Sequence, residues 1–228
     1  MSTEWIEIAP GFRGYLARPD AGSGPGIVVI QEIFGVNAVM RGIADDLAAQ
    51  GYVALVPDLF WRLEPGVDIT DQSDAEWKKA LDLMQRFDID KGVEDIQAAI
   101  ATLRRQPGVA KVGAVGYCLG GLLAYLTATR TDIDASVGYY GVNIPAFLGE
   151  ANLIRRSLML HIAAEDGFVP QPAQQQMIDG LKDNPWVTLH RYDGVDHAFA
   201  RPGGKHFDDA AATLANSRTA AFFRRHLA

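Results

Sequence analysis

The chain has almost no cysteine and no long apolar run. Cys118 is the one cysteine among 228 residues, so no disulfide can form within the chain, and we expect a reducing compartment. The apolar run at residues 27–30 is far shorter than the roughly 20 residues that a membrane helix needs. The first residues lack the basic stretch and apolar run of a secretory signal. These absences predict a cytoplasmic protein with no membrane partner.

Basic residues are also scarce. The 21 Lys and Arg residues against 28 Asp and Glu residues give a formal net charge of −7. A general nucleic-acid binder needs a basic face, so we expect no nucleic-acid partner. The sequence has no His-Glu-x-x-His segment and no second cysteine for a metal-binding pair, so we expect no metal site. Nothing in the sequence indicates an oligomeric state.

The sequence does have short β-branched runs that alternate with helical periodicity. Strands are expected at residues 4–8, 12–17, 26–31, 52–56, 109–115, 135–140, 157–163 and 186–192, and helices at 36–48, 93–103, 119–130, 172–182 and 207–226. Strands that alternate with helices of this length imply crossover connections and a mostly parallel sheet. We predict one α/β domain over residues 1–228, with helices on both faces of the sheet and an excursion from the pattern at about 58–90.

The segment Gly116-Tyr117-Cys118-Leu119-Gly120-Gly121 lies between an expected strand and an expected helix. It has the form of a nucleophile elbow, with sulfur in place of the usual serine oxygen. Such a turn needs small residues two before and two after the nucleophile, because the two backbones meet there. The turn also places the sulfur over a helix N-terminus, where the dipole and free N–H groups favour thiolate. A small buried core cysteine is the alternative interpretation.

A thiol nucleophile needs a base, and the base needs an orienting acid. Of the five histidines, His197 alone follows an expected strand in a loop before the last helix. The other four fall inside expected strands or at the ends of the last helix: His161, His190, His206 and His226. The sequence therefore favours His197 as the base.

The acid candidate is Asp166, which comes just after the expected strand at 157–163, and its neighbour Glu165 is the rival. The chain order Cys118, Asp166, His197 is the nucleophile, acid, histidine order of α/β-hydrolases. Because sites in such sheets lie beyond the carboxyl ends of the strands, we predict that these three residues form a catalytic triad. The backbone N–H groups of Leu119 and Ile33 are the expected oxyanion hole.

Four segments of the chain resemble the dienelactone hydrolase (carboxymethylenebutenolidase) family. They are Gln31-Glu32-Ile33-Phe34-Gly35, the elbow at 116–121, Gly138-Tyr139-Tyr140-Gly141, and Asp196-His197-Ala198-Phe199-Ala200-Arg201. The resemblance runs over essentially the whole chain. It implies an α/β-hydrolase fold and a cofactor-free enzyme that opens cyclic enol-lactones through an acyl-enzyme on Cys118. The implied partner is a small lactone or ester.

The resemblance also implies roles for two charged residues. Glu32 matches the family glutamate that contacts the resting thiol, and Arg201 matches an arginine that binds the substrate carboxylate. From the residues alone, Glu32 also fits a solvated acid after a strand, and Arg201 also fits a surface ion pair or a loop tie. The family's second carboxylate-binding arginine has no counterpart in segment 74–80. There Lys78 or Lys79 offers a point charge without the planar fork, and Trp77 offers an apolar pocket lining.

Two alternative functions stay open at this point. A general carboxylesterase or thioesterase on the same scaffold is favoured by Trp77 and by the missing arginine. A non-catalytic redox-thiol module would use an exposed Cys118, but it leaves Asp166 and His197 without a purpose.

Overall fold

A computed structural model describes residues 1–228. The chain divides into two compact units, Met1–Ala114 and Val115–Ala228, and each is described by itself. The expectation of one domain over the whole chain stays a prediction. No helix combines the length and the apolar character that a membrane crossing requires.

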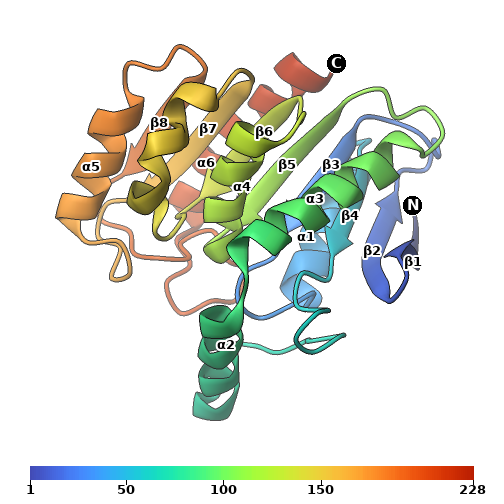
Figure 1. The fold of residues 1–228 in the computed structure, drawn as a ribbon, viewed down its shortest axis with the longest axis horizontal. Coiled ribbons are helices and arrows are strands. Elements are labelled where there is room, and N and C mark those ends of the chain that lie inside the picture. The colour runs from blue at the N-terminus through green and yellow to red at the C-terminus, as the bar shows by residue number, and fades with distance from the viewer. The chain divides into compact units, whose positions relative to one another are not determined.

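The first unit is built around strands in the order β1-β2-β4-β3. Its elements are β1 (Ser2–Ala9), β2 (Phe12–Arg18), β3 (Gly26–Ile30), α1 (Ala38–Ala49), β4 (Val53–Pro57), α2 (Asp74–Arg86) and α3 (Ile89–Arg104). β1 is the edge strand and pairs antiparallel with β2, β2 pairs antiparallel with β4, and β3 pairs parallel with β4. α3 lies in front of β3 and β4 and α1 lies behind them (Figure 1), so helices cover both faces here.

The second unit repeats the alternation, with strands in the order β5-β6-β7-β8. Its elements are β5 (Val112–Tyr117, which begins before the unit boundary), α4 (Leu119–Arg130), β6 (Ala135–Tyr139), η1 (Ile144–Leu153), β7 (Ser157–Ala163), α5 (Gln171–Leu181), β8 (Val187–Tyr192) and α6 (Asp209–Leu227). β6 pairs parallel with β7, and β7 with β8. In Figure 1, α4 lies in front of these strands and α6 behind them. The predicted fold class, an α/β-hydrolase fold with a mostly parallel sheet, is confirmed.

Continuous apolar runs explain the central strands. Every residue of β3, β4, β5 and β6 is buried, as is typical of parallel strands covered on both faces.

Local side-chain and glycine signals explain where helix α1 begins and ends. The Asn37 side chain accepts a hydrogen bond of 3.1 Å from the backbone N–H of Met40 at the start of α1, and Gly51 follows its end with a φ of +98°. Asparagine is a preferred N-cap residue, and glycine tolerates the positive φ that follows a helix end.

Two helical segments were not expected. α2 lies inside the excursion at 58–90 and buries only Ala80 and Leu83, so its apolar stripe is too narrow to stand out in the sequence. η1 is a 3₁₀ helix with Ile144 as its one buried residue, and its three-residue period does not match the α-helical pattern. Neither segment has the broad apolar face that hydrophobic periodicity detects in a sequence.

Candidate active site

Cys118 occupies a sharp turn between β5 and α4. Its backbone has a φ of 57° and a ψ of −114°, a region that costs free energy for a residue with a Cβ. The Cys118 N–H donates to the carbonyl of Tyr139 at 3.1 Å, and the Cys118 carbonyl accepts from the N–H of Gly121 at 2.9 Å. Hydrogen bonds on both sides therefore hold the strained residue in place.

Glycines allow the strand and the helix to meet at this turn. A Cβ on Gly116 would lie 1.9 Å from the carbonyl oxygen of Gly120, and a Cβ on Gly121 would lie 2.6 Å from the carbonyl oxygen of Tyr139. Atoms cannot approach this closely, so the backbone requires glycine at both positions. The approach of Gly116 to Gly120 is the one that the elbow interpretation predicts, whereas Gly121 lets α4 approach β6.

The helix start beside the sulfur offers a hydrogen-bond donor. Leu119 is the first residue of α4, and the N–H groups of a first helical turn have no acceptor within the helix. The Leu119 N–H, one of the two expected oxyanion-hole donors, therefore has no acceptor within α4. The other expected donor, Ile33, lies in the first unit after β3 and is buried.

The predicted base and acid are in direct contact. The Nδ1 atom of His197 lies 2.9 Å from Oδ2 of Asp166 and 3.1 Å from Oδ1. Because an ionised carboxylate only accepts hydrogen bonds, Nδ1 carries the proton. Asp166 also accepts from the backbone N–H groups of Phe168 at 2.8 Å and Val169 at 3.1 Å. The rival acid Glu165 is exposed, so the structure brings Asp166 and not Glu165 to the imidazole.

The sulfur of Cys118 completes this line of contacts. Burial lowers the pKa of His197, but attraction to the Cys118 sulfur and the hydrogen bond with Asp166, together with a side-chain hydrogen bond to Cys118, raise it to about 10. The imidazole is thus hydrogen-bonded on one side to the carboxylate and on the other to the thiol group. Sulfur, imidazole and carboxylate come together from positions far apart in the sequence. Their catalytic roles stay predictions.

Aromatic rings confine the imidazole. The ring of Tyr140 lies edge-on to His197 with centroids 5.0 Å apart, and Phe168 does the same at 4.8 Å. Tyr140 lies in a segment that resembles the family, but the sequence indicates a role for neither residue. Stacking contacts between loops have no periodic signature, so the sequence held no signal for Phe168.

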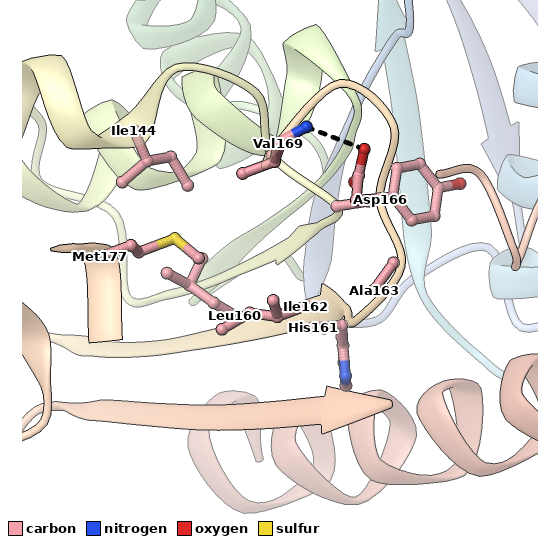
Figure 2. A pocket seen from close by; sticks show the side chains of 10 residues that line it. Ile144, Leu160, His161, Ile162, Ala163, Asp166, Val169 and Met177 are labelled. Atoms are coloured by element: carbon pink, nitrogen blue, oxygen red, sulfur yellow. Dashed lines mark hydrogen bonds between the residues drawn. The ribbon is translucent and has the colours of Figure 1, made fainter. Parts of the chain in front are cut away.

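A small cavity lies beside the acid. It measures about 10 Å³ and is lined by Asp166 together with apolar side chains from β7, η1 and α5, among them Leu160, Ile144 and Met177. Figure 2 shows the Asp166 carboxylate next to this cavity, with its bond from Val169 drawn as a dashed line. This volume is close to the minimum that one water molecule needs. The space therefore suits at most a single water and not a substrate.

The charged residues that the resemblance singled out are buried. Arg201 is 8% exposed and Glu32 is 1% exposed, so neither is the surface ion pair or solvated acid that the residues alone allowed. The Arg201 N–H donates to the carbonyl of Ala198 at 3.0 Å, which closes a turn directly after His197. Glu32 follows β3 in the first unit.

The two α2 residues differ in exposure. Trp77 is half-buried, its ring lies edge-on to Phe34 with centroids 5.2 Å apart, and its indole N–H donates to the carbonyl of Asp71 at 3.0 Å. Lys78 is exposed. Their roles in substrate binding stay predictions.

Of the remaining histidines, His161 has the core role that its place in a strand suggested. It is 1% exposed, and its two ring nitrogens lie 2.8 Å from the hydroxyl of Tyr192 and 2.9 Å from that of Thr219. Burial lowers its pKa well below the usual value, with smaller contributions from His190 and Arg218. No group of three or more His, Cys, Asp or Glu side chains is placed to hold a metal ion.

Comparison with known proteins identifies the family of the chain. The Dienelactone hydrolase family matches residues 12–227. A protein of Azospirillum brasilense is 50% identical over 220 residues, covering 95% of this chain and 94% of its own. The carboxymethylenebutenolidase of Pseudomonas putida is 41% identical over 223 residues, covering 96% and 94%.

Solved structures agree on the fold. A crystal structure of a protein from Klebsiella pneumoniae superposes with a TM-score of 0.86 at 25% identity, covering 98% of both chains. The dienelactone hydrolase from Anabaena variabilis superposes with a TM-score of 0.72 at 18% identity, covering 100% of this chain and 99% of its own. From the extent of these matches, the chain belongs to the dienelactone hydrolase family and is a carboxylic ester hydrolase of the carboxymethylenebutenolidase kind.

Proposed function

We propose that the chain hydrolyses cyclic enol-lactones, or related carboxylic esters, by nucleophilic catalysis with Cys118 as the nucleophile. The observation that supports this most directly is the double contact of His197, which meets Asp166 at 2.9 Å and hydrogen-bonds the Cys118 side chain. An imidazole held between a carboxylate and a thiol can move a proton to and from sulfur and to a leaving oxygen.

In the first half-reaction, the sulfur of Cys118 attacks the ester carbonyl and the C–O bond of the ring breaks. The thioester forms on Cys118, and the enol oxygen leaves with the proton that His197 supplies. The negative oxygen of the tetrahedral intermediate accepts hydrogen bonds from the N–H of Leu119 and from the N–H of Ile33, the donor expected on the loop after β3. Losing one such donor typically costs on the order of 100- to 1,000-fold in rate.

In the second half-reaction, water attacks the thioester. His197 accepts a proton from this water, while Asp166 holds the imidazole in the tautomer with its proton on Nδ1. The C–S bond breaks, the acid is released and Cys118 regains its proton. No redox step or cofactor enters this sequence.

One buried charge supports an anionic substrate. A planar guanidinium can donate two parallel hydrogen bonds to a carboxylate, and Arg201 is such a group, buried four residues after His197. We propose that it binds the carboxylate of an anionic lactone and that Glu32 contacts the resting thiol. Trp77 and Lys78 are proposed as further pocket residues. A cytoplasmic location remains an expectation.

A broader carboxylesterase or thioesterase is the second candidate. It is favoured by Trp77 and by the absence of an arginine from segment 74–80, the stretch that corresponds to the family's second carboxylate-binding arginine. A redox-thiol module is disfavoured because Cys118 is 6% exposed rather than open to solvent.

The test is to trap the acyl-enzyme. The protein is mixed with a panel of anionic enol-lactones and neutral aryl esters, quenched with acid and mapped by mass spectrometry. We expect one acyl adduct on the peptide that contains Cys118. The Cys118→Ala variant should form no adduct and lose turnover while keeping its fold. Near wild-type turnover in Cys118→Ala would refute the proposed nucleophile.

A further inference from the structure

Asp196 precedes His197 and contacts both loops that carry the acid and the base. Its Oδ1 atom accepts a hydrogen bond of 2.6 Å from the N–H of His197 and one of 2.9 Å from the N–H of Gly167. Gly167 in turn follows Asp166. One carboxylate oxygen therefore binds the backbone next to the acid and the backbone of the base itself.

The other oxygen of Asp196 is held from a third segment. Its Oδ2 atom lies 3.3 Å from Nδ1 of His206, and the same nitrogen lies 3.3 Å from the carbonyl oxygen of His197. His206 lies in the loop that leads into α6. Asp196 and His206 therefore contact both backbone polar groups of His197, its N–H and its carbonyl.

The contacts of Asp196 lie past the last residues that β7 and β8 pair. Pairing of β7 with β8 ends at Ala163 and Tyr192. Two further backbone bonds follow, from the N–H of Ala164 to the carbonyl of Tyr192 at 2.9 Å and from the N–H of Glu165 to the carbonyl of Val195 at 3.0 Å. Past that point the two loops are joined by side chains: the His197 imidazole on Asp166, and the Asp196 carboxylate on Gly167. The contact of Asp196 with Gly167 is therefore a second link between the acid loop and the base loop, besides the hydrogen bond of His197 with Asp166.

The backbone after the base needs such support. Ala198 has a φ of 63°, which is unfavourable for a residue with a Cβ and persists only where surrounding contacts hold it. The Asp196 carboxylate suits this task. Burial raises its pKa, but the hydrogen bonds from the N–H groups of Gly167 and His197, together with attraction to the His206 and His197 rings, lower the pKa below the usual value. Hydrogen bonds to an ionised carboxylate are stronger than those to a neutral acceptor.

We propose that Asp196 is a positioning residue for the hydrolysis, whose carboxylate sets the spacing and orientation of Asp166 and His197 by clamping the two loops that carry them. It touches neither the substrate nor the thiol and acts through His197. The proposal rests on the function of Cys118, His197 and Asp166 proposed above.

The test compares three substitutions at this position. Asp196→Ala removes both acceptor oxygens, Asp196→Asn keeps one oxygen in place without the charge, and Asp196→Glu keeps the charge but moves the oxygens by one methylene. The control is Asp193→Ala in the same loop. The Asp193 side chain is 86% exposed and forms an ion pair with Arg191. Each variant is assayed for kcat and KM on a lactone that the wild type turns over.

We expect Asp196→Ala to lower kcat by about 10- to 100-fold with little change in KM, because small displacements of catalytic groups cost this much in rate. Asp196→Asn should recover most of the loss, and Asp196→Glu should resemble Asp196→Ala. Asp193→Ala should keep the wild-type kcat. The reverse order, with Glu active and Asn inactive, would assign Asp196 a purely electrostatic role and overturn the clamp.

A proton NMR measurement separates positioning from stability. The Nδ1–H of His197, bonded to Asp166, should give a downfield resonance in the wild type and in Asp196→Asn. We expect this resonance to broaden or disappear in Asp196→Ala and Asp196→Glu, at temperatures where circular dichroism shows folded protein. A wild-type kcat and an unchanged resonance in Asp196→Glu would refute the proposal, even where Asp196→Ala does not fold.

The two proposals fail in different ways. If the wild type forms no adduct on Cys118, the proposed function is wrong, yet the imidazole resonance still reports whether Asp196 clamps the loops. If the adduct forms and Asp196→Ala turns over at the wild-type rate, the nucleophile is right and the clamp is wrong.

Discussion

The carbonyl oxygen of Gly120 lies 1.9 Å from the point where a Cβ on Gly116 would stand. The two glycines flank Cys118, and their contact closes the turn that carries the sulfur between β5 and α4. A methyl group cannot enter this space unless backbone moves, and the moving part would be the start of α4, which supplies the Leu119 N–H.

We therefore expect Gly116→Ala to lower the free energy of unfolding by about 2–4 kcal/mol, because both atoms in the clash are tied to backbone. Urea denaturation followed by circular dichroism measures this. The matched control is Gly42→Ala in α1, where a Cβ meets nothing within 4 Å and alanine should stabilise the helix by about 0.5–1 kcal/mol. Equal stability of the two variants would contradict the elbow geometry.

The acid can be identified by a pair of neighbouring substitutions. Asp166→Asn should lower kcat by about 10³- to 10⁴-fold while the fold is kept, because an amide can donate to the imidazole and favour the wrong tautomer. Glu165→Gln alters an exposed side chain and should leave kcat within about twofold. Steady-state assays on one lactone decide between them. A larger loss in Glu165→Gln would reverse the assignment.

Arg201 should separate an anionic lactone from a neutral ester. We expect Arg201→Ala to lower kcat/KM for an anionic enol-lactone by about 10- to 100-fold and to change that for a neutral aryl ester much less. Arg201→Lys keeps the charge but loses the planar fork, so it should recover only part of the loss. Equal losses on both substrates would favour the general esterase and a structural role for this buried residue.

The buried imidazole of His161 should make stability depend on pH. Its folded-state pKa lies below the usual value of 6.5, so the unfolded chain binds this proton first. The stabilisation is present above about pH 6.5 and is lost as the pH falls, by up to about 1.4 kcal/mol per pH unit. His190 stacks on the same ring and its pKa is also lowered, first by burial, so it acts with the same sign.

Urea midpoints at pH 7.5, 6.5, 5.5 and 4.5 test this dependence. His161→Gln cannot titrate in this range, so we expect it to be less stable than the wild type at pH 7.5 but to lose less stability on acidification. Parallel acid slopes for the wild type and His161→Gln would show that His161 does not titrate on unfolding.

The contribution of His197 to stability depends on pH in the opposite sense. Its pKa of about 10 gives stabilisation that is complete below about pH 6.5 and is lost as the pH rises through 10.

Different physical signals explain what the sequence could and could not predict. The helix at 119–130 was predicted with the bounds of α4, because a glycine-flanked turn and an apolar run define both ends. His197 and Asp166 are predictable because functional sites in such sheets lie beyond the carboxyl ends of the strands. The order nucleophile, acid, histidine along the chain is a second constraint. The sequence holds no signal for Asp196, because its contact with Gly167 joins positions 29 apart and acidic loop residues usually face solvent.

The outermost strand of the first unit has a consequence for the behaviour of the protein at high concentration. β1 pairs with β2 on one side alone, and an open strand edge invites another chain to add a strand and aggregate. This edge carries Glu4 and Glu7 and loses its regular register between Glu7 and Ala9. Glu4 is paired with Arg18, whereas Glu7 is exposed. The irregular register, the exposed Glu7 and the net negative charge of the chain discourage edge-to-edge association between its copies.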